Sequence, residues 1–223
     1  MRIGVVTFPG SLDDRDAARA VRMAGAEAVS LWHADADLHG VDAVVLPGGF
    51  SYGDYLRCGA IARFSPAMRG VRRAAEDGLP VLGVCNGFQV LCEAQLLPGV
   101  LRPNHHGHFV CRDVDLIVDA AGSPWTERAD HGEVLRIPIK HHDGAWYAPP
   151  DVAAAVEERG QVLLRYTDNP NGSLADVAGV TNETGTVFGL MPHPEHAVDA
   201  LIGPTDGGAV VGGLLEIAAA VPA

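Results

Sequence analysis

The feature that most constrains the fold is a short apolar run, residues 80–84, that leads into Gly-Val-Cys-Asn-Gly at residues 83–87. A strand, a nucleophile-type residue between glycines and then helix-compatible residues (88–94) form the pattern of a nucleophile elbow. Such an elbow holds its side chain in a strained turn at a helix N-terminus. There a thiol pKa falls and backbone N–H groups face an oxyanion. The pattern predicts that Cys85 is a nucleophile.

A second motif, Met-Pro-His-Pro-Glu, occupies residues 191–195. A cysteine nucleophile needs a base near its sulfur, and that base needs an orienting acceptor on its other ring nitrogen. The two prolines favour extended backbone, in which His193 and Glu195 point to the same side. The pair can therefore serve Cys85 as base and orienting carboxylate. Taken alone, the motif also fits a proline-rich loop with two solvated polar residues.

Apolar and helix-compatible segments alternate through the first half of the chain. We predict strands over residues 3–8, 27–32, 43–46 and 80–84, and helices around 17–23 and over 67–77. Near-continuous apolar strands between helices indicate a doubly wound, mostly parallel α/β sheet. Active sites on such sheets lie at the carboxyl ends of strands. Gly48, Gly49 and Cys85 all fall at such ends.

The pattern changes from about residue 109, where apolar and polar residues alternate over 110–118. Further strands are predicted over 134–139, 161–166 and 187–190, and a helix over 210–220. The strand candidates follow one another without long helices between them, which predicts an antiparallel β layer added to the parallel core. No repeat or linker marks a boundary, so we expect a single domain over residues 1–223.

Composition narrows the functional class. Apolar residues make up 48% of the 223 residues, which excludes a disordered chain. No uninterrupted apolar run approaches the ~20 residues of a membrane span. The N-terminus passes straight into a predicted strand without a signal-peptide pattern, so we expect a cytoplasmic location. The formal net charge of -12 argues against a nucleic-acid binder.

Two histidine-rich stretches, residues 105–108 and 141–142, contain ligand-type side chains. Their spacing is not diagnostic of any metal site. The four cysteines form no C-x-x-C pair and are interpreted as reduced thiols. We therefore expect no metal.

With these motifs in order, the chain resembles the class I (triad-type) glutamine amidotransferases, whose core is flavodoxin-like. More narrowly, it is similar to glutaminase subunits of phosphoribosylformylglycinamidine synthase. The narrow resemblance rests on longer strings, at residues 47–60, 85–91, 109–112, 137–141, 171–173 and 189–195. The sequence departs from the family at His196, where arginine is common, and at His142, which replaces a glycine.

The resemblance implies that Cys85 attacks the side-chain amide of glutamine and forms a γ-glutamyl thioester. His193 would be the base and Glu195 the residue that orients it. The expected oxyanion and glutamine-binding residues are Gly48, Gly49, Asn86 and Gln89. Backbone N–H groups of Gly49 and Asn86 would hold the oxyanion, and Gln89 would help to position glutamine.

The resemblance also implies a partner. The ammonia would pass to a synthetase subunit, joined in many bacteria by a third small subunit, which converts formylglycinamide ribonucleotide to formylglycinamidine ribonucleotide in purine biosynthesis. ATP and magnesium would belong to that synthetase, and no cofactor is expected in this chain. The sequence contains no G-x-x-x-x-G-K-[ST] phosphate loop. The alternative is a free-standing γ-glutamyl or other cysteine hydrolase on the same fold, active without a partner.

Overall fold

The fold is built around one nine-stranded sheet in the order β2-β1-β3-β4-β11-β10-β9-β6-β7. The computed structural model describes residues 1–120, 122–126 and 128–220. The first five strands in this order are parallel, and three of them, β3, β4 and β11, are fully buried and apolar, as the sequence predicts for a parallel core. The five strands are β2 (Glu27–Trp32), β1 (Arg2–Thr7), β3 (Ala43–Leu46), β4 (Val81–Val84) and β11 (Val187–Leu190).

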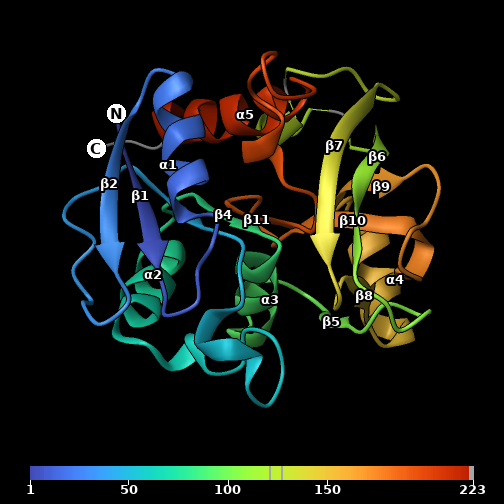
Figure 1. Cartoon of the computed structure of the whole chain (residues 1–223), viewed down its shortest axis with the longest axis horizontal. Helices are drawn as coiled ribbons and strands as arrows, with labels where there is room; N and C mark the ends of the chain where they lie inside the picture. The colour runs from blue at the N-terminus through green and yellow to red at the C-terminus, as the bar shows by residue number, and fades with distance from the viewer. Residues whose placement is uncertain (121, 127, 221–223) are drawn as a thin grey trace.

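Helices cover both faces of this parallel half (Figure 1). Helices α1 (Asp14–Met23) and α5 (Gly207–Ala220) lie on one side of it, while α2 (Pro66–Glu76) and α3 (Asn86–Glu93) lie on the other. Ser65 caps α2 by accepting a bond from the Met68 N–H, and Pro66 follows at the first helical position. The doubly wound core predicted from the alternating segments is confirmed.

The antiparallel strands predicted for the C-terminal half are present, and they continue the same sheet (Figure 1). These are β10 (Val177–Thr181), β9 (Val162–Tyr166), β6 (Val110–Val118) and β7 (Val134–His141). A separate two-stranded sheet pairs β5 (Val100–Arg102) with β8 (Ala145–Tyr147).

One helix in this half, α4 (Pro150–Glu158), is missing from the sequence prediction. It begins at the second of two prolines and buries only Val156, so its apolar face gives almost no periodic signal. The later strands were expected to follow one another without long helices between them; α4, a helix of nine residues, lies between β8 and β9.

The sheet order places the predicted site residues together. Strands β3, β4 and β11 are neighbours and parallel, so their carboxyl ends meet at one edge. Gly48 and Gly49 follow β3, Cys85 follows β4, and His193 follows β11. Residues far apart in the sequence therefore converge where open α/β sheets bind ligands. In the described part of the chain, no helix has the length and apolar character needed to cross a bilayer.

Candidate active site

Cys85 occupies a strained turn between β4 and α3. Its φ of 49° and ψ of -104° lie in a region that side-chain-bearing residues rarely adopt. The turn is tight because a Cβ at Gly87 would lie 1.9 Å from the Leu46 carbonyl oxygen, so only glycine fits there. The strand-turn-helix geometry predicted for an elbow is therefore present, with α3 starting immediately behind the sulfur.

His193 and Glu195 form a buried pair, with Nδ1 of the ring 2.6 Å from Oε1 of the carboxylate. Both side chains are almost fully buried. Because a carboxylate can only accept, Nδ1 carries a proton and donates it to Glu195. The other ring nitrogen, Nε2, has no hydrogen-bond partner among the described residues. It is thus free to exchange a proton with the Cys85 thiol.

Electrostatics around His193 favour the imidazolium. Burial of the ring lowers its pKa, but the charge of Glu195 and the neighbouring Cys85 sulfur raise it more strongly, to about 10. Beside Cys85, such a ring is a strong acceptor for the proton of the thiol. The structure thus brings Cys85, His193 and Glu195 together, as the motifs predict.

Sequence reasoning missed a second carboxylate at this site. Asp13 stands at the N-cap of α1, which begins at Asp14, but its side chain makes no capping bond. Instead, its carboxylate bonds the ammonium of Lys140 and lies 3.3 Å from His196 Nε2. The partners come from strands and loops far along the chain, so only the tertiary structure reveals them.

Asn86 and Gln89, two of the expected oxyanion and glutamine-binding residues, follow Cys85 on α3 and bond to neighbouring loops through their side chains. Asn86 opens α3, and its side chain accepts from the Ser51 N–H at 3.1 Å and donates to Gln89 Oε1 at 2.9 Å. Gln89 in turn donates to the Asp143 carbonyl at 2.7 Å. This chain of bonds joins the elbow helix to the loop that follows Gly49. Gly48 packs behind the site and does not line the cavity.

A cavity of about 930 Å³ opens over these groups. Such a volume accommodates a small amino-acid substrate with its solvent. Apolar side chains form part of its wall, and its polar lining includes Cys85, Gln89 and His193 but not Asn86. The polar and charged residues that line it beside the nucleophile include Asp13, Arg57, Cys85, Gln89, Lys140, His141 and His193, and Gly49 lines it as well.

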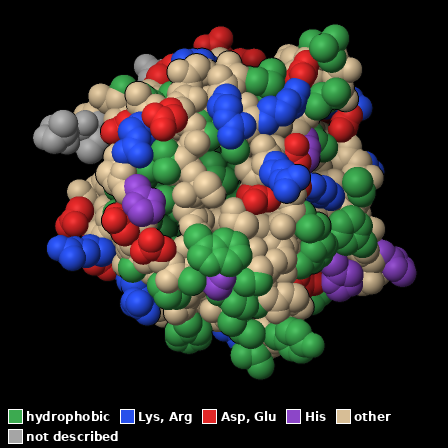
Figure 2. Space-filling view, turned by 60° about the vertical axis from the view of Figure 1, so that its left-hand side comes forward, with side chains coloured by type: hydrophobic (Ala, Val, Ile, Leu, Met, Phe, Trp, Pro, Cys, Tyr) green, Lys and Arg blue, Asp and Glu red, His purple; other side chains and the backbone are tan. Residues whose placement is uncertain are grey.

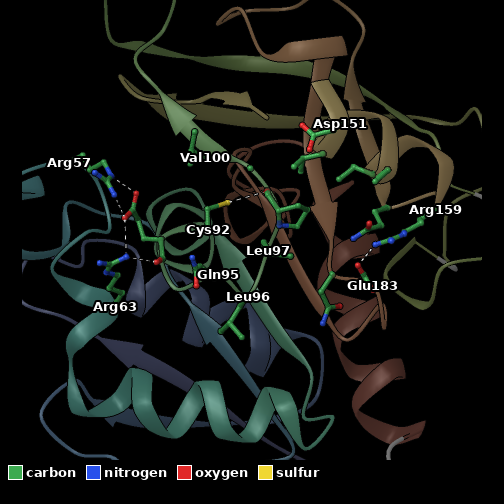
Figure 3. A pocket seen from close by; sticks show the side chains of 18 residues that line it. Arg57, Arg63, Cys92, Gln95, Leu96, Leu97, Val100, Asp151, Arg159 and Glu183 are labelled. Atoms are coloured by element: carbon green, nitrogen blue, oxygen red, sulfur yellow. Dashed lines mark hydrogen bonds and ion pairs between the residues drawn. The ribbon is translucent and has the colours of Figure 1, made fainter. Parts of the chain in front are cut away.

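A second cavity of about 740 Å³ lies behind α3 (Figure 3). Arg57 and Val100 line both cavities. Arg57 and Arg63 point toward Glu93 on one side, and Arg159 faces Glu183 on the other (Figure 3). This cavity contains none of the predicted catalytic residues, so the chemistry belongs to the first.

The donor atoms of Asp13, His193, Glu195 and His196 lie within 4.8 Å of one another, which is a spacing that could hold a metal ion. These donors already bond to protein groups, because Glu195 accepts from His193 and Asp13 binds Lys140. We interpret the cluster as a network of charged hydrogen bonds. On the face drawn in Figure 2, acidic and basic side chains are mixed, without a continuous basic patch.

Comparison with known proteins places this geometry in a family. A model described as a CobB/CobQ-like glutamine amidotransferase domain matches residues 1–208. The chain is 65% identical over 204 residues to the phosphoribosylformylglycinamidine synthase subunit PurQ of Frankia casuarinae, which covers 91% of this chain and 88% of that protein. It is 62% identical over 207 residues to the PurQ subunit of Mycobacterium tuberculosis H37Rv, with 93% and 92% covered.

Two solved structures share the fold. A chain in the structure of PurLQS from Thermotoga maritima superposes with a TM-score of 0.89 at 45% identity, covering 96% of this chain and 97% of that one. A Thermoplasma acidophilum protein described as a GMP synthase subunit shares the fold, with a TM-score of 0.68 at 18% identity and coverage of 99% and 94%.

Proposed function

This chain belongs to the CobB/CobQ-like glutamine amidotransferase family, and we propose that it is the glutaminase subunit of phosphoribosylformylglycinamidine synthase. The observation that carries the proposal is the strained Cys85 elbow beside a buried His193–Glu195 pair at the floor of one cavity. The high identity to PurQ subunits over nine-tenths of the chain supports the purine-pathway assignment.

The reaction follows from the positions of three side chains. The Cys85 thiol gives its proton to Nε2 of His193, and the sulfur attacks the side-chain carbonyl carbon of glutamine. His193 then returns the proton to the leaving nitrogen, and ammonia departs as the γ-glutamyl thioester forms. Water, deprotonated by the same nitrogen, hydrolyses the thioester to glutamate and restores the thiol. Glu195 fixes the tautomer and stabilises the charged ring.

We assign stabilisation of the tetrahedral oxyanion to the backbone N–H groups of Gly49 and Asn86. The N–H of Asn86 lies in the first turn of α3, where amides lack intrahelical acceptors. Losing one such donor typically costs about 3 kcal/mol of transition-state stabilisation. Gln89, which lines the cavity one turn further along α3, helps to position the substrate glutamine.

The ammonia passes to a synthetase subunit that makes formylglycinamidine ribonucleotide. The Thermotoga maritima complex is titled PurLQS, which supports assembly of this chain with a large synthetase and a third, small subunit. We assign ATP and magnesium to the synthetase, and we propose that this chain works without a cofactor of its own, as one domain, in the cytoplasm.

The test is the glutaminase rate of this chain, measured alone and after mixing with the cognate synthetase, its nucleotide substrates and the small third subunit. We expect a low rate alone that rises steeply in the complex, since ammonia released without an acceptor is wasted. A high rate alone that the synthetase leaves unchanged would indicate an independent hydrolase and would contradict the proposal.

A further inference from the structure

His193 faces a second carboxylate besides Glu195. Oδ2 of Asp13 lies 3.8 Å from Nδ1 of the ring, and the Asp13 side chain is only 4% exposed. The approach is possible because residue 48 is glycine. A Cβ there would lie 2.4 Å from Asp13 Oδ2 and 2.7 Å from His193 Cε1. Gly48 therefore leaves room for the carboxylate and the ring to pack against each other.

Asp13 remains ionised in this buried position. Burial raises its pKa, but bonds from His196 and Lys140 and the charge of His193 lower it further, to well below its usual range. The Lys140 ammonium bonds Oδ1, the oxygen turned away from His193. The carboxylate is thus shared between the Lys140 ammonium and a ring that gains and loses a proton.

Helix capping does not explain this side chain. Asp13 stands at the N-cap of α1, yet its carboxylate accepts no bond from that helix. A purely structural ion pair with Lys140 would not need to contact the ring. Lys140 also touches the nucleophile, because its carbonyl oxygen accepts a long bond from the Cys85 sulfur at 3.8 Å. The pair therefore contacts both ends of the Cys85–His193 proton transfer.

We propose that Asp13 is a positioning residue for the glutaminase reaction, whose carboxylate stabilises the His193 imidazolium formed when Cys85 gives up its proton. Lys140 sets how much of that negative charge the ring experiences. This inference rests on the proposed function, since it supplies a further residue for the same proton transfer. Asp13 acts through His193 and forms no bond to substrate.

The sign of the effect follows from the groups around the ring. Glu195 and the Cys85 thiolate favour the charged ring of His193. His141 and His196, when protonated, oppose that charge. Lys140 opposes it indirectly, because its ammonium offsets part of the negative charge of Asp13. Removing the Asp13 charge weakens attraction for the imidazolium, so His193 loses its proton at a lower pH. Removing the Lys140 charge has the opposite effect on the ring.

The experiment compares Asp13→Asn and Lys140→Gln with the parent chain. We expect Asp13→Asn to lower kcat for glutamine about tenfold, with little change in KM, in the complex with the synthetase. An NMR titration of the His193 ring should show its pKa lowered by about one unit in Asp13→Asn and raised in Lys140→Gln. Asp119→Asn, which removes a carboxylate paired with Arg165 in the antiparallel half, is the matched control and should leave both readouts unchanged.

Two results would overturn the inference. One is a His193 titration in Asp13→Asn that coincides with that of the parent. The other is a raised KM with unchanged kcat, which would make Asp13 a substrate contact. Far-ultraviolet circular dichroism checks that each variant folds. If Asp13→Asn does not fold, the test rests on Lys140→Gln, in which a His193 pKa that is not raised would overturn the inference. Failure of the proposed function is distinct, because the parent complex would then make no product from glutamine.

Discussion

Arg57 holds Glu93 through two parallel bonds, with Nε 2.5 Å from Oε1 and Nη2 2.7 Å from Oε2. The pair ties the loop that follows Gly49 to the far end of α3, whose near end lies behind Cys85. Glu93 is buried, and Arg63 also donates to its carbonyl oxygen at 3.0 Å. The wall of the glutamine cavity is thus anchored to the helix that positions the nucleophile.

This anchor gives a prediction about substrate binding. We expect Glu93→Gln to lower the free energy of unfolding by about 1–2 kcal/mol, since a charged, forked bond becomes a weaker neutral one. The loosened Arg57 loop should raise KM for glutamine more than it lowers kcat. Steady-state kinetics and urea unfolding measure both. Glu183→Gln is the control, because its pair with Arg159 is exposed and should be worth less than about 1 kcal/mol.

The Glu195 carboxylate makes the orientation of His193 testable. We expect Glu195→Gln to lower kcat by about 10²-fold or more, because the amide can present its NH2 group to Nδ1 and so favour the wrong tautomer. The pKa of His193 should fall as well, since Glu195 is the main group that raises it. The pH profile of kcat and a ring titration measure the two effects. An unchanged kcat would remove Glu195 from the mechanism.

Gly48 should not tolerate a methyl group, because its nearest neighbours are groups of the site. A Cβ at this position would collide with Asp13 and His193, so Gly48→Ala should displace the base and abolish most activity. A Cβ at Gly208 would meet nothing within 4 Å, so Gly208→Ala is the control and should keep full activity. Full activity in Gly48→Ala would show that the ring does not occupy the described position.

The lowered pKa of His141 should make the stability of the fold depend on pH. Burial and the charge of His193 lower its pKa to about 4, against about 6.5 in an unfolded chain. Between these values the unfolded state binds more protons, so stability falls as the pH drops from about 6.5 to about 4, by up to ~3 kcal/mol in total. We expect His141→Asn to show a shallower loss over this window in urea unfolding. Equal slopes for both chains would contradict the assignment.

Much of the fold, and the convergence of Cys85, His193 and Glu195, could be predicted because the signals are local. The apolar run before Cys85, its flanking glycines and the prolines around His193 each act within a few residues. Parallel strand order then determines that the ends of β3, β4 and β11 meet.

Asp13 and Lys140 could not be predicted in this way. They lie on different elements, and an aspartate before a helix already has an ordinary explanation as part of its first turn. The short helix α4 escaped because it buries almost nothing, and the pattern of its residues does not separate it from a loop.

The most direct test of the central claim uses Cys85→Ala in the reconstituted complex. Synthesis of formylglycinamidine ribonucleotide is measured with glutamine and, separately, with ammonium salts as the nitrogen source. The account predicts that the variant loses glutamine-dependent synthesis while ammonia-dependent synthesis continues at the parent rate, because the synthetase is intact and only the source of ammonia is removed. Glutamine-dependent synthesis that survives in Cys85→Ala would show that the nucleophile is assigned to the wrong residue.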